Sequence, residues 1–232
     1  MKIEGRNSVY EALKSNLTVN TLMVEKGTAN SIVALARDKG VKVTFVDKSV
    51  LDKSSTEGKH QGYIADVTDF AYCEVEDILA SSKTPFVVIL DGVEDPHNFG
   101  SIIRACECAG VDGIIIGRNR QVAVTDTVVR VSAGAVAHVK IARVTNVNNT
   151  IKQLQQSGVW VYALDMDGQE ITTVNLTGAV ALVVGSEGEG ISAYTKKCCD
   201  AVVSLKLKGK VNSLNASVAC GIAVYEVVRQ RG

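Results

Sequence analysis

Three polar, glycine-rich stretches in the last two-thirds of the sequence contain the side chains that could do chemistry. They are LDGVEDPHNFGSIIRACECAG at 90–110, ALVVGSEGEGIS at 181–192 and LKLKGKVNSLNASVACGIAVYEVVRQR at 205–231. Each pattern is typical of a strand, a polar turn and then a helix. Open α/β sheets bind ligands at the carboxyl ends of their strands. The stretches therefore predict a ligand site made of turns at one edge of a sheet.

The first stretch offers an amide and a cation. Asn98 stands at the mouth of a predicted helix, where it is either a helix cap or a functional group. Arg104 lies in the apolar run Ile102-Ile103-Arg104-Ala105 of the same helix. It is either a surface charge or a half-buried cation that needs a partner. The apolar neighbours favour the half-buried, functional interpretation.

The second stretch ends its predicted strand in Gly185-Ser-Glu-Gly-Glu-Gly. Its three glycines let the backbone approach a ligand closely. The stretch matches neither the phosphate-binding Walker loop nor the GxGxxG dinucleotide fingerprint. Glu187 is its candidate acid or hydrogen-bond acceptor.

The third stretch opens the last predicted helix with hydroxyl and amide side chains. Ser213 either caps that helix or joins Asn215 and Ser217 in binding a polar ligand, such as a carboxylate or a ribose, at the helix N-terminus. Lys206, Lys208 and Lys210 alternate just before it, which by itself is typical of a solvated face.

The composition predicts a folded globular protein of one large domain or two unequal ones, because 46% of its 232 residues are hydrophobic and two are proline. No apolar run reaches membrane-spanning length, and the first residues resemble neither a signal nor a transit peptide. A cytoplasmic location without membrane association is therefore expected. Six cysteines and three histidines lack metal-site spacing, which predicts free thiols and no bound metal. The zero net charge neither favours nor excludes a nucleic-acid partner.

The elements that must position these residues fall into two predicted domains. Residues 1–70 indicate a small α/β domain with strands at 21–25, 41–46 and 61–67 and helices at 7–14, 31–39 and 48–53. Residues 71–84 are interpreted as a linker, with the alternative that 75–80 is a helix packed on either domain. From residue 85 to 232, strands alternate with helices, which predicts a parallel sheet covered on both faces.

Together, the three stretches resemble the motifs of the SpoU/TrmH (SPOUT) family of RNA ribose 2′-O-methyltransferases. The resemblance rests on Asn98 with Arg104, on Gly-Ser-Glu-Gly-Glu-Gly with Glu187, and on Ser213-Leu-Asn215, and it covers the whole chain. The N-terminal IEGRNSVYEAL and the His60-Gln61-Gly62 step are similar to the subgroup that methylates a guanosine ribose in 23S ribosomal RNA. Leu205-Lys206-Leu207 departs from that subgroup, which has Ile-Pro-Met there.

The resemblance implies a C-terminal α/β SPOUT domain with a deep trefoil knot and a small ribosomal-protein-like α/β domain that binds RNA. It implies that S-adenosylmethionine binds bent in the knot without a metal ion. It also implies a homodimer, in which the three motifs meet only when two catalytic domains pair.

The resemblance assigns residues as well. Gly185, Leu205 and Leu214, with Leu164 beside them, are expected to line the cofactor site. The expected catalytic group is Asn98, Arg104, Glu187, Ser213 and Asn215. Arg6, His60 and Gln61 are expected to contact RNA. Arg104 is either the base, as proposed for the family, or an electrostatic stabiliser of the alkoxide whose proton passes to Glu187, a phosphate or water.

Other functions remain open at this point. The chain could recognise RNA without modifying it, although all five expected catalytic residues are present. Within the enzymes, a transfer RNA ribose methyltransferase is the alternative to the ribosomal RNA enzyme. A nucleotide-dependent oxidoreductase is disfavoured by the missing dinucleotide fingerprint.

Overall fold

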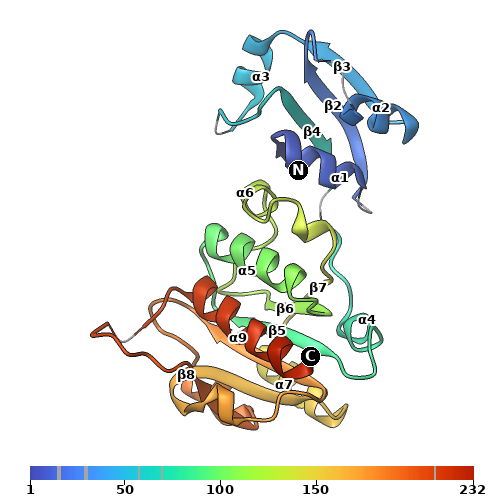
Figure 1. Cartoon of the computed structure of the whole chain (residues 1–232). Helices are drawn as coiled ribbons and strands as arrows, with labels where there is room; N and C mark the ends of the chain where they lie inside the picture. The colour runs from blue at the N-terminus through green and yellow to red at the C-terminus, as the bar shows by residue number, and fades with distance from the viewer. Residues whose placement is uncertain (15–16, 29–30, 57, 69, 212) are drawn as a thin grey trace. The chain divides into compact units, whose positions relative to one another are not determined.

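The computed structural model describes residues 1–14, 17–28, 31–56, 58–68, 70–211 and 213–232. The chain forms two compact units, drawn in Figure 1. Unit 1 consists of Met1–Ala71 and Val124–His138, and unit 2 consists of Tyr72–Ala123 and Val139–Gly232. In the described residues, no helix is long and apolar enough to cross a membrane.

Unit 1 is built on a four-stranded mixed sheet in the order β1-β4-β2-β3. Strand β4 pairs antiparallel with β1 and β2, and β2 pairs parallel with β3. In chain order the elements are β1 (Lys2–Glu4), α1 (Arg6–Lys14), β2 (Val19–Glu25), α2 (Ser31–Asp38), β3 (Lys42–Val46), α3 (Lys48–Ser54) and β4 (Tyr63–Val67). Strand β1 is not among the three predicted strands. Its three residues are too few to show a periodic pattern.

A segment from the middle of the chain also belongs to unit 1. It contains α6 (Asp126–Val131) and the 3₁₀ turn η1 (Ala135–Ala137). The backbone N–H of Lys2 donates to Asp126 Oδ1 at 3.0 Å, and His138 Nε2 lies 3.3 Å from Glu11 Oε2. Only glycine fits at Gly134, where φ is 89° and a Cβ would lie 2.4 Å from the Glu11 Cβ.

Unit 2 is built on a six-stranded sheet in the order β10-β8-β9-β5-β6-β7, and every neighbouring pair is parallel. The central strands are buried along nearly their whole length because helices cover both faces, which explains their continuous apolar sequences. The strands are β5 (Phe86–Asp91), β6 (Gly113–Gly117), β7 (Ile141–Val144), β8 (Trp160–Glu170), β9 (Val180–Gly185) and β10 (Ala201–Ser204).

Helices α4 (Val75–Leu79) and α7 (Val147–Gln156) bury their apolar sides in one core cluster with alternate residues of the strands. Helices α5 (Pro96–Cys108) and α9 (Ala216–Arg231) lie side by side over the other face (Figure 1). The remaining elements are the 3₁₀ turn η2 (Ile171–Thr173) and α8 (Ala193–Cys198). The parallel α/β architecture predicted from the sequence is confirmed.

The unit boundaries differ from the predicted ones in two places. Residues 72–84, interpreted as a linker, belong to unit 2, because Val75 and Ile78 of α4 are part of its core. Residues 124–138, placed in the C-terminal domain, belong to unit 1. The trefoil knot stays a prediction.

Candidate functional site

The site lies where the strand order of unit 2 reverses. Strands β5, β6 and β7 extend the sheet in one direction, and β9, β8 and β10 extend it in the other. The turns that follow β5 and β9 therefore meet at the carboxyl ends of two adjacent strands, Asp91 being paired with Gly185 at the last position. This is the position at which open α/β sheets bind ligands.

The first turn places Asn98 through a helix cap. Asp95 is the N-cap of α5, and its carboxylate accepts hydrogen bonds from the backbone N–H groups of His97 and Asn98. Pro96 at the first helical position suits this cap, since it has no N–H to leave unpaired. Asn98 is thus not the cap, and its side chain is free for another role. It is 7% exposed and turns toward the third motif.

Asn215 joins the three motifs. Its Oδ1 accepts from the backbone N–H groups of Ser217 and Val218 at 3.0 and 3.3 Å, which caps α9. Its Nδ2 donates to Asn98 Oδ1 at 2.9 Å and also to Glu187 Oε1. The cap is therefore Asn215 and not Ser213. The amide of Asn215 fixes the carboxylate of Glu187 beside the buried amide of Asn98.

The three motifs meet within a single chain, which corrects the expectation that two catalytic domains must pair to bring them together. The reason is the sheet register: β5 and β9 are direct neighbours, and α9 packs beside α5. One motif residue is left out of this arrangement, namely Arg104.

Arg104 is exposed on α5, contrary to the expected half-buried position. The helix buries residues at spacings of three and four, which are Phe99, Ile102, Ile103 and Cys106. The next position after Ile103 is rotated away from the sheet by about 100°. Arg104 makes no hydrogen bond or ion pair with the part of the chain that the structure describes, and it is not among the residues that line the two cavities below.

The glycine-rich second motif folds into a tight turn. Ser186 and Gly190 exchange backbone hydrogen bonds of 3.2 and 3.1 Å across it. Gly185 has no room for a side chain, because a Cβ there would lie 2.2 Å from the carbonyl carbon of Gly190. This close approach lets the turn present Glu187 at its tip.

A cavity of about 400 Å³ lies on one side of this turn. All four residues expected at the cofactor site line it, namely Leu164, Gly185, Leu205 and Leu214, and so does Ser213. The wall from β8 exists because the pairing of β8 with β10 jumps from Ala163 to Gln169, which leaves residues 164–168 out of the ladder. The cavity is within the size range of about 300–1,000 Å³ that is usual for small-molecule sites.

An ion pair that sequence reasoning missed lines the same cavity. Lys196 Nζ lies 2.6 Å from Asp165 Oδ2, and the two side chains are 23% and 17% exposed. Burial alone would raise the pKa of Asp165, but hydrogen bonds from Lys196 and the Met166 N–H outweigh it and hold the pKa below its usual value. The hydrogen bond with Asp165 raises the pKa of Lys196 in turn.

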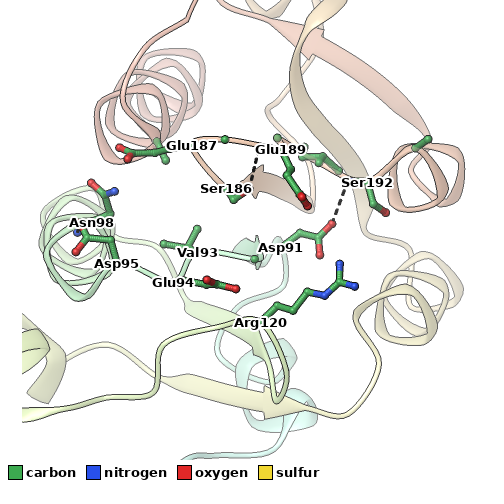
Figure 2. Close-up of a pocket in the computed structure, with 16 residues that line it drawn as sticks. Asp91, Val93, Glu94, Asp95, Asn98, Arg120, Ser186, Glu187, Glu189 and Ser192 are labelled. Carbon is green, nitrogen blue, oxygen red and sulfur yellow. Dashed lines mark hydrogen bonds between the residues drawn. The ribbon is translucent and has the colours of Figure 1, made fainter.

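A larger cavity of about 710 Å³ lies next to the first, and Glu187 and Ala216 line both. Figure 2 shows its polar walls, which come from the turns after β5, β6 and β9. Its charged side chains are Asp91, Glu94, Asp95, Glu187, Glu189 and Arg120. Sequence reasoning gave Glu94 and Glu189 no role and took Arg120 as part of a solvated face, although their positions just after strand ends could have marked them.

The residues expected to contact RNA lie in unit 1. His60 is 4% exposed; its Nδ1 accepts from the Gly62 N–H at 3.0 Å, and its Nε2 lies 2.9 Å from Asp52 Oδ1. Its ring is therefore occupied inside the unit and holds the neighbouring loop in place. Gln61 is exposed at a φ of 50°, and its Oε1 accepts from the Arg6 N–H at 3.1 Å. The first residue of α1, Arg6, and the loop residue Gln61 thus lie side by side on the surface, and His60 supports that loop from within.

No group of three metal-ligating side chains occurs in the residues that the structure describes. The polar side chains of the two cavities come from separate turns and include cations and hydroxyls as well as carboxylates.

Comparisons with known proteins identify the family. Residues 85–225 match the model of the SpoU rRNA Methylase family, and residues 2–73 match the model described as RNA 2′-O ribose methyltransferase substrate binding. The chain is 41% identical over 237 residues to YacO of Bacillus subtilis, which is named as a TrmH family tRNA/rRNA methyltransferase. That alignment covers 98% of this chain and 94% of YacO.

Solved structures give the same result. The AdoMet-bound rRNA methyltransferase of Sinorhizobium meliloti matches with a TM-score of 0.85 and 27% identity, over 98% of this chain and 86% of that one. The SpoU methyltransferase AviRb of Streptomyces viridochromogenes shares the fold, with a TM-score of 0.87 and 23% identity over 100% and 90% of the two chains. The chain belongs to the SpoU rRNA Methylase family of RNA methyltransferases.

Proposed function

We propose that the protein transfers a methyl group from S-adenosylmethionine to the ribose 2′-hydroxyl of a guanosine in 23S ribosomal RNA. The observation that supports this most directly is the position of Glu187. It is hydrogen-bonded to Asn215 and lines both cavities. A methyl donor on one side of the turn and a ribose on the other side would meet at this carboxylate.

The smaller cavity fits the cofactor. Leucine side chains from β8 and from the segments before α9 offer an apolar surface for an adenine ring, and the bare backbone at Gly185 offers hydrogen-bonding groups at close range. The similar S. meliloti protein is described as AdoMet-bound, which supports this assignment. When bound, the cofactor supplies an electrophilic methyl group on a sulfonium ion, and no metal is needed.

The residues of this chain must orient the 2′-hydroxyl and take its proton. Asn215 donates to Asn98 and Glu187 at once, which holds the carboxylate of Glu187 in a fixed position at the boundary of the two cavities. Glu187 then accepts the proton from the ribose oxygen. Asn98, whose Oδ1 is held by Asn215, orients the ribose through its own amide N–H groups.

Arg104 acts in a homodimer under this proposal. Val218, Ile222 and Tyr225 form a stripe on α9 at helical spacing, and each is about half exposed. Such a stripe is suited to an isologous contact with a second copy. Arg104 on the neighbouring helix α5 would lie within that contact, from which it can stabilise the alkoxide in the site of the second copy.

Ribosomal RNA is favoured as the substrate because the matching family is described as rRNA methylases. Relatives are named as tRNA/rRNA methyltransferases, so transfer RNA is the second candidate. Exposed Arg6 and Gln61 in unit 1 are the residues that would contact either RNA.

The test is methyl transfer in vitro. Ribosomal and transfer RNA fractions from cells that lack the protein are incubated with the full chain and S-adenosylmethionine carrying a labelled methyl group. The proposal expects label at a guanosine ribose in the 23S fraction, and Glu187→Gln is expected to lower the rate at least about a hundredfold. Label confined to transfer RNA would favour the second candidate. RNA binding without any transfer would refute the enzymatic proposal.

Arg104 needs a separate test. Arg104→Ala is expected to lower the methylation rate by about two orders of magnitude without a change in melting temperature, because the side chain is exposed in the single chain. A mixed dimer is made from one Arg104→Ala chain and one Glu187→Gln chain. If Arg104 acts across the dimer, the site of the Arg104→Ala chain keeps its own Glu187 and receives Arg104 from the other chain. Recovery of activity on mixing would support that, and its absence would place Arg104 in its own chain's site or outside the mechanism.

A further inference from the structure

The larger cavity contains three charged side chains that the proposed mechanism does not use. Glu94 comes from the turn after β5, Glu189 from the turn after β9 and Arg120 from the loop after β6. Figure 2 shows Glu189 and Arg120 on opposite sides of the cavity, with Asp91 between them and Glu94 to one side. None of the three side chains makes a hydrogen bond or ion pair with the described residues.

The other carboxylates of this cavity already have partners. Asp91 Oδ2 accepts from the Ser192 N–H at 3.4 Å, Asp95 caps α5, and Glu187 is bonded to Asn215. The groups left to meet a ligand are therefore two acceptor carboxylates, Glu94 and Glu189, and one donor guanidinium, Arg120.

The cavity adjoins the place where the ribose reacts, because Asn98 and Glu187 form part of its wall. The base of a nucleotide is attached to the ribose carbon next to the one that carries the 2′ oxygen. If that oxygen lies at Glu187, the base must lie close by. The volume of about 710 Å³ is enough for a base and its ribose. The excess of carboxylates repels phosphate, so the RNA backbone is expected to stay outside and the base to enter.

The four bases differ in what they can offer to such walls. Guanine has two adjacent donors, N1–H and the N2 amino group, which match the two oxygens of a carboxylate, and two acceptors, O6 and N7, which match an arginine. Adenine and cytosine place an acceptor beside their single amino group. Uracil has one N–H between two carbonyls. Carboxylates cannot donate, so each of these three bases leaves acceptor facing acceptor.

We propose that the larger cavity is a base pocket selective for guanine, in which Glu94 and Glu189 accept from N1–H and the N2 amino group and Arg120 donates to O6 and N7. This inference rests on the proposed function and names the residues that select the target base. An unpaired base is commonly read by hydrogen bonds to these edges when chemistry is done on its nucleotide.

The test uses an RNA fragment that contains the methylated nucleotide found with the wild-type protein. That guanosine is replaced by inosine, which lacks the N2 amino group, or by 7-deazaguanosine, which lacks N7. Single-turnover rates are measured for the wild type, for the double variant Glu94→Gln with Glu189→Gln, and for Arg120→Ala. Glu76→Gln is the matched control, since Glu76 lies on α4 before β5 and a glutamine keeps the oxygen that accepts from Gln153.

Each replacement should slow the wild type about tenfold to a hundredfold, the effect of one lost hydrogen bond to a charged group. The double variant should lose the preference for guanosine over inosine, and Arg120→Ala should lose the preference for guanosine over 7-deazaguanosine. Arg120→Ala should bind S-adenosylmethionine like the wild type in calorimetry, and both variants should melt at the same temperature as the wild type. Glu189 also lines the cofactor cavity, so the rates of the double variant are compared at saturating S-adenosylmethionine. Glu76→Gln should keep every preference.

Three results would overturn the inference in distinguishable ways. Unchanged preferences in the double variant and in Arg120→Ala would remove these residues from base selection. Methylation of another base by the wild type would refute the guanine pocket and leave ribose methylation standing. Absence of methyl transfer by the wild type would refute both proposals together.

Discussion

Asn215 has two structural roles that substitutions can separate. Its Oδ1 caps α9, and its Nδ2 holds Glu187 and Asn98. Asn215→Ala removes both functions. Asn215→Ser keeps a hydroxyl that can cap the helix but removes the amide donors. Comparing the two variants therefore distinguishes the stability of α9 from the positioning of Glu187.

The magnitudes follow from the bonds involved. Losing the cap costs about 1 kcal/mol, which lowers the melting temperature of a domain of this size by roughly 2–4 °C. Losing the donor to Glu187 removes a charge-assisted hydrogen bond worth about 1.5–3 kcal/mol. If that bond acts in the transition state, the rate falls by about tenfold to a hundredfold in both variants.

Thermal melts and single-turnover methylation on the same preparations measure these effects, with calorimetry of S-adenosylmethionine binding as the check on the cofactor site. Asn215→Ser should melt close to the wild type and still react slowly. A serine variant that methylates at the wild-type rate would refute the role of the amide. An alanine variant with an unchanged melting temperature would refute the capping role.

Three further predictions concern the cofactor cavity and the proposed dimer. Gly185→Ala should abolish the roughly micromolar binding of S-adenosylmethionine, about −8 kcal/mol, expected of the wild type in calorimetry, because its Cβ would lie 2.2 Å from the Gly190 carbonyl carbon; unchanged binding would contradict this. Ile222→Glu should reduce the mass in light scattering from two chains to one, and a variant that stays dimeric would place the contact elsewhere. The lowered pKa of Asp165 means that its ion pair stabilises the fold above the ordinary carboxyl pKa of about 4 and less as the pH falls below it. Lys196→Met should therefore be less stable than the wild type at pH 7, and this difference in unfolding free energy should shrink as the pH falls. A difference that stays constant in denaturant titrations from pH 7 to 3 would count against this.

Much of the catalytic unit could be predicted from the sequence because its strands are continuous apolar runs between glycine and polar turns. Parallel strands bring their carboxyl ends to one edge, so the three motif turns had to meet there. The smaller cavity is lined by Leu164, Gly185, Leu205 and Leu214 for the same reason.

The caps and the exposure of Arg104 could not be read from the sequence. Asp95 and Asn215 cap the helices in place of Asn98 and Ser213, because several side chains within three residues are able to cap and only the backbone path selects one. An apolar run around Arg104 does not reveal which face of the helix is buried. That depends on where α5 meets the sheet.

Contacts between segments distant in the sequence could not be predicted either. One cavity is lined by Glu94, Glu189 and Arg120, which come from three separate turns. Predicting that these turns meet requires the strand order, which the sequence does not show. The packing of α6 in unit 1 depends on pairs such as Lys2 with Asp126, which lie more than a hundred positions apart and leave no periodic signal.

The central claim is that this protein methylates a guanosine ribose in 23S ribosomal RNA. The most direct measurement maps 2′-O-methyl groups in total RNA from cells with and without the protein, and with the Glu187→Gln variant in its place. One 2′-O-methylguanosine in 23S RNA should disappear without the protein and stay absent with the variant. Identical maps in all three strains would contradict the claim.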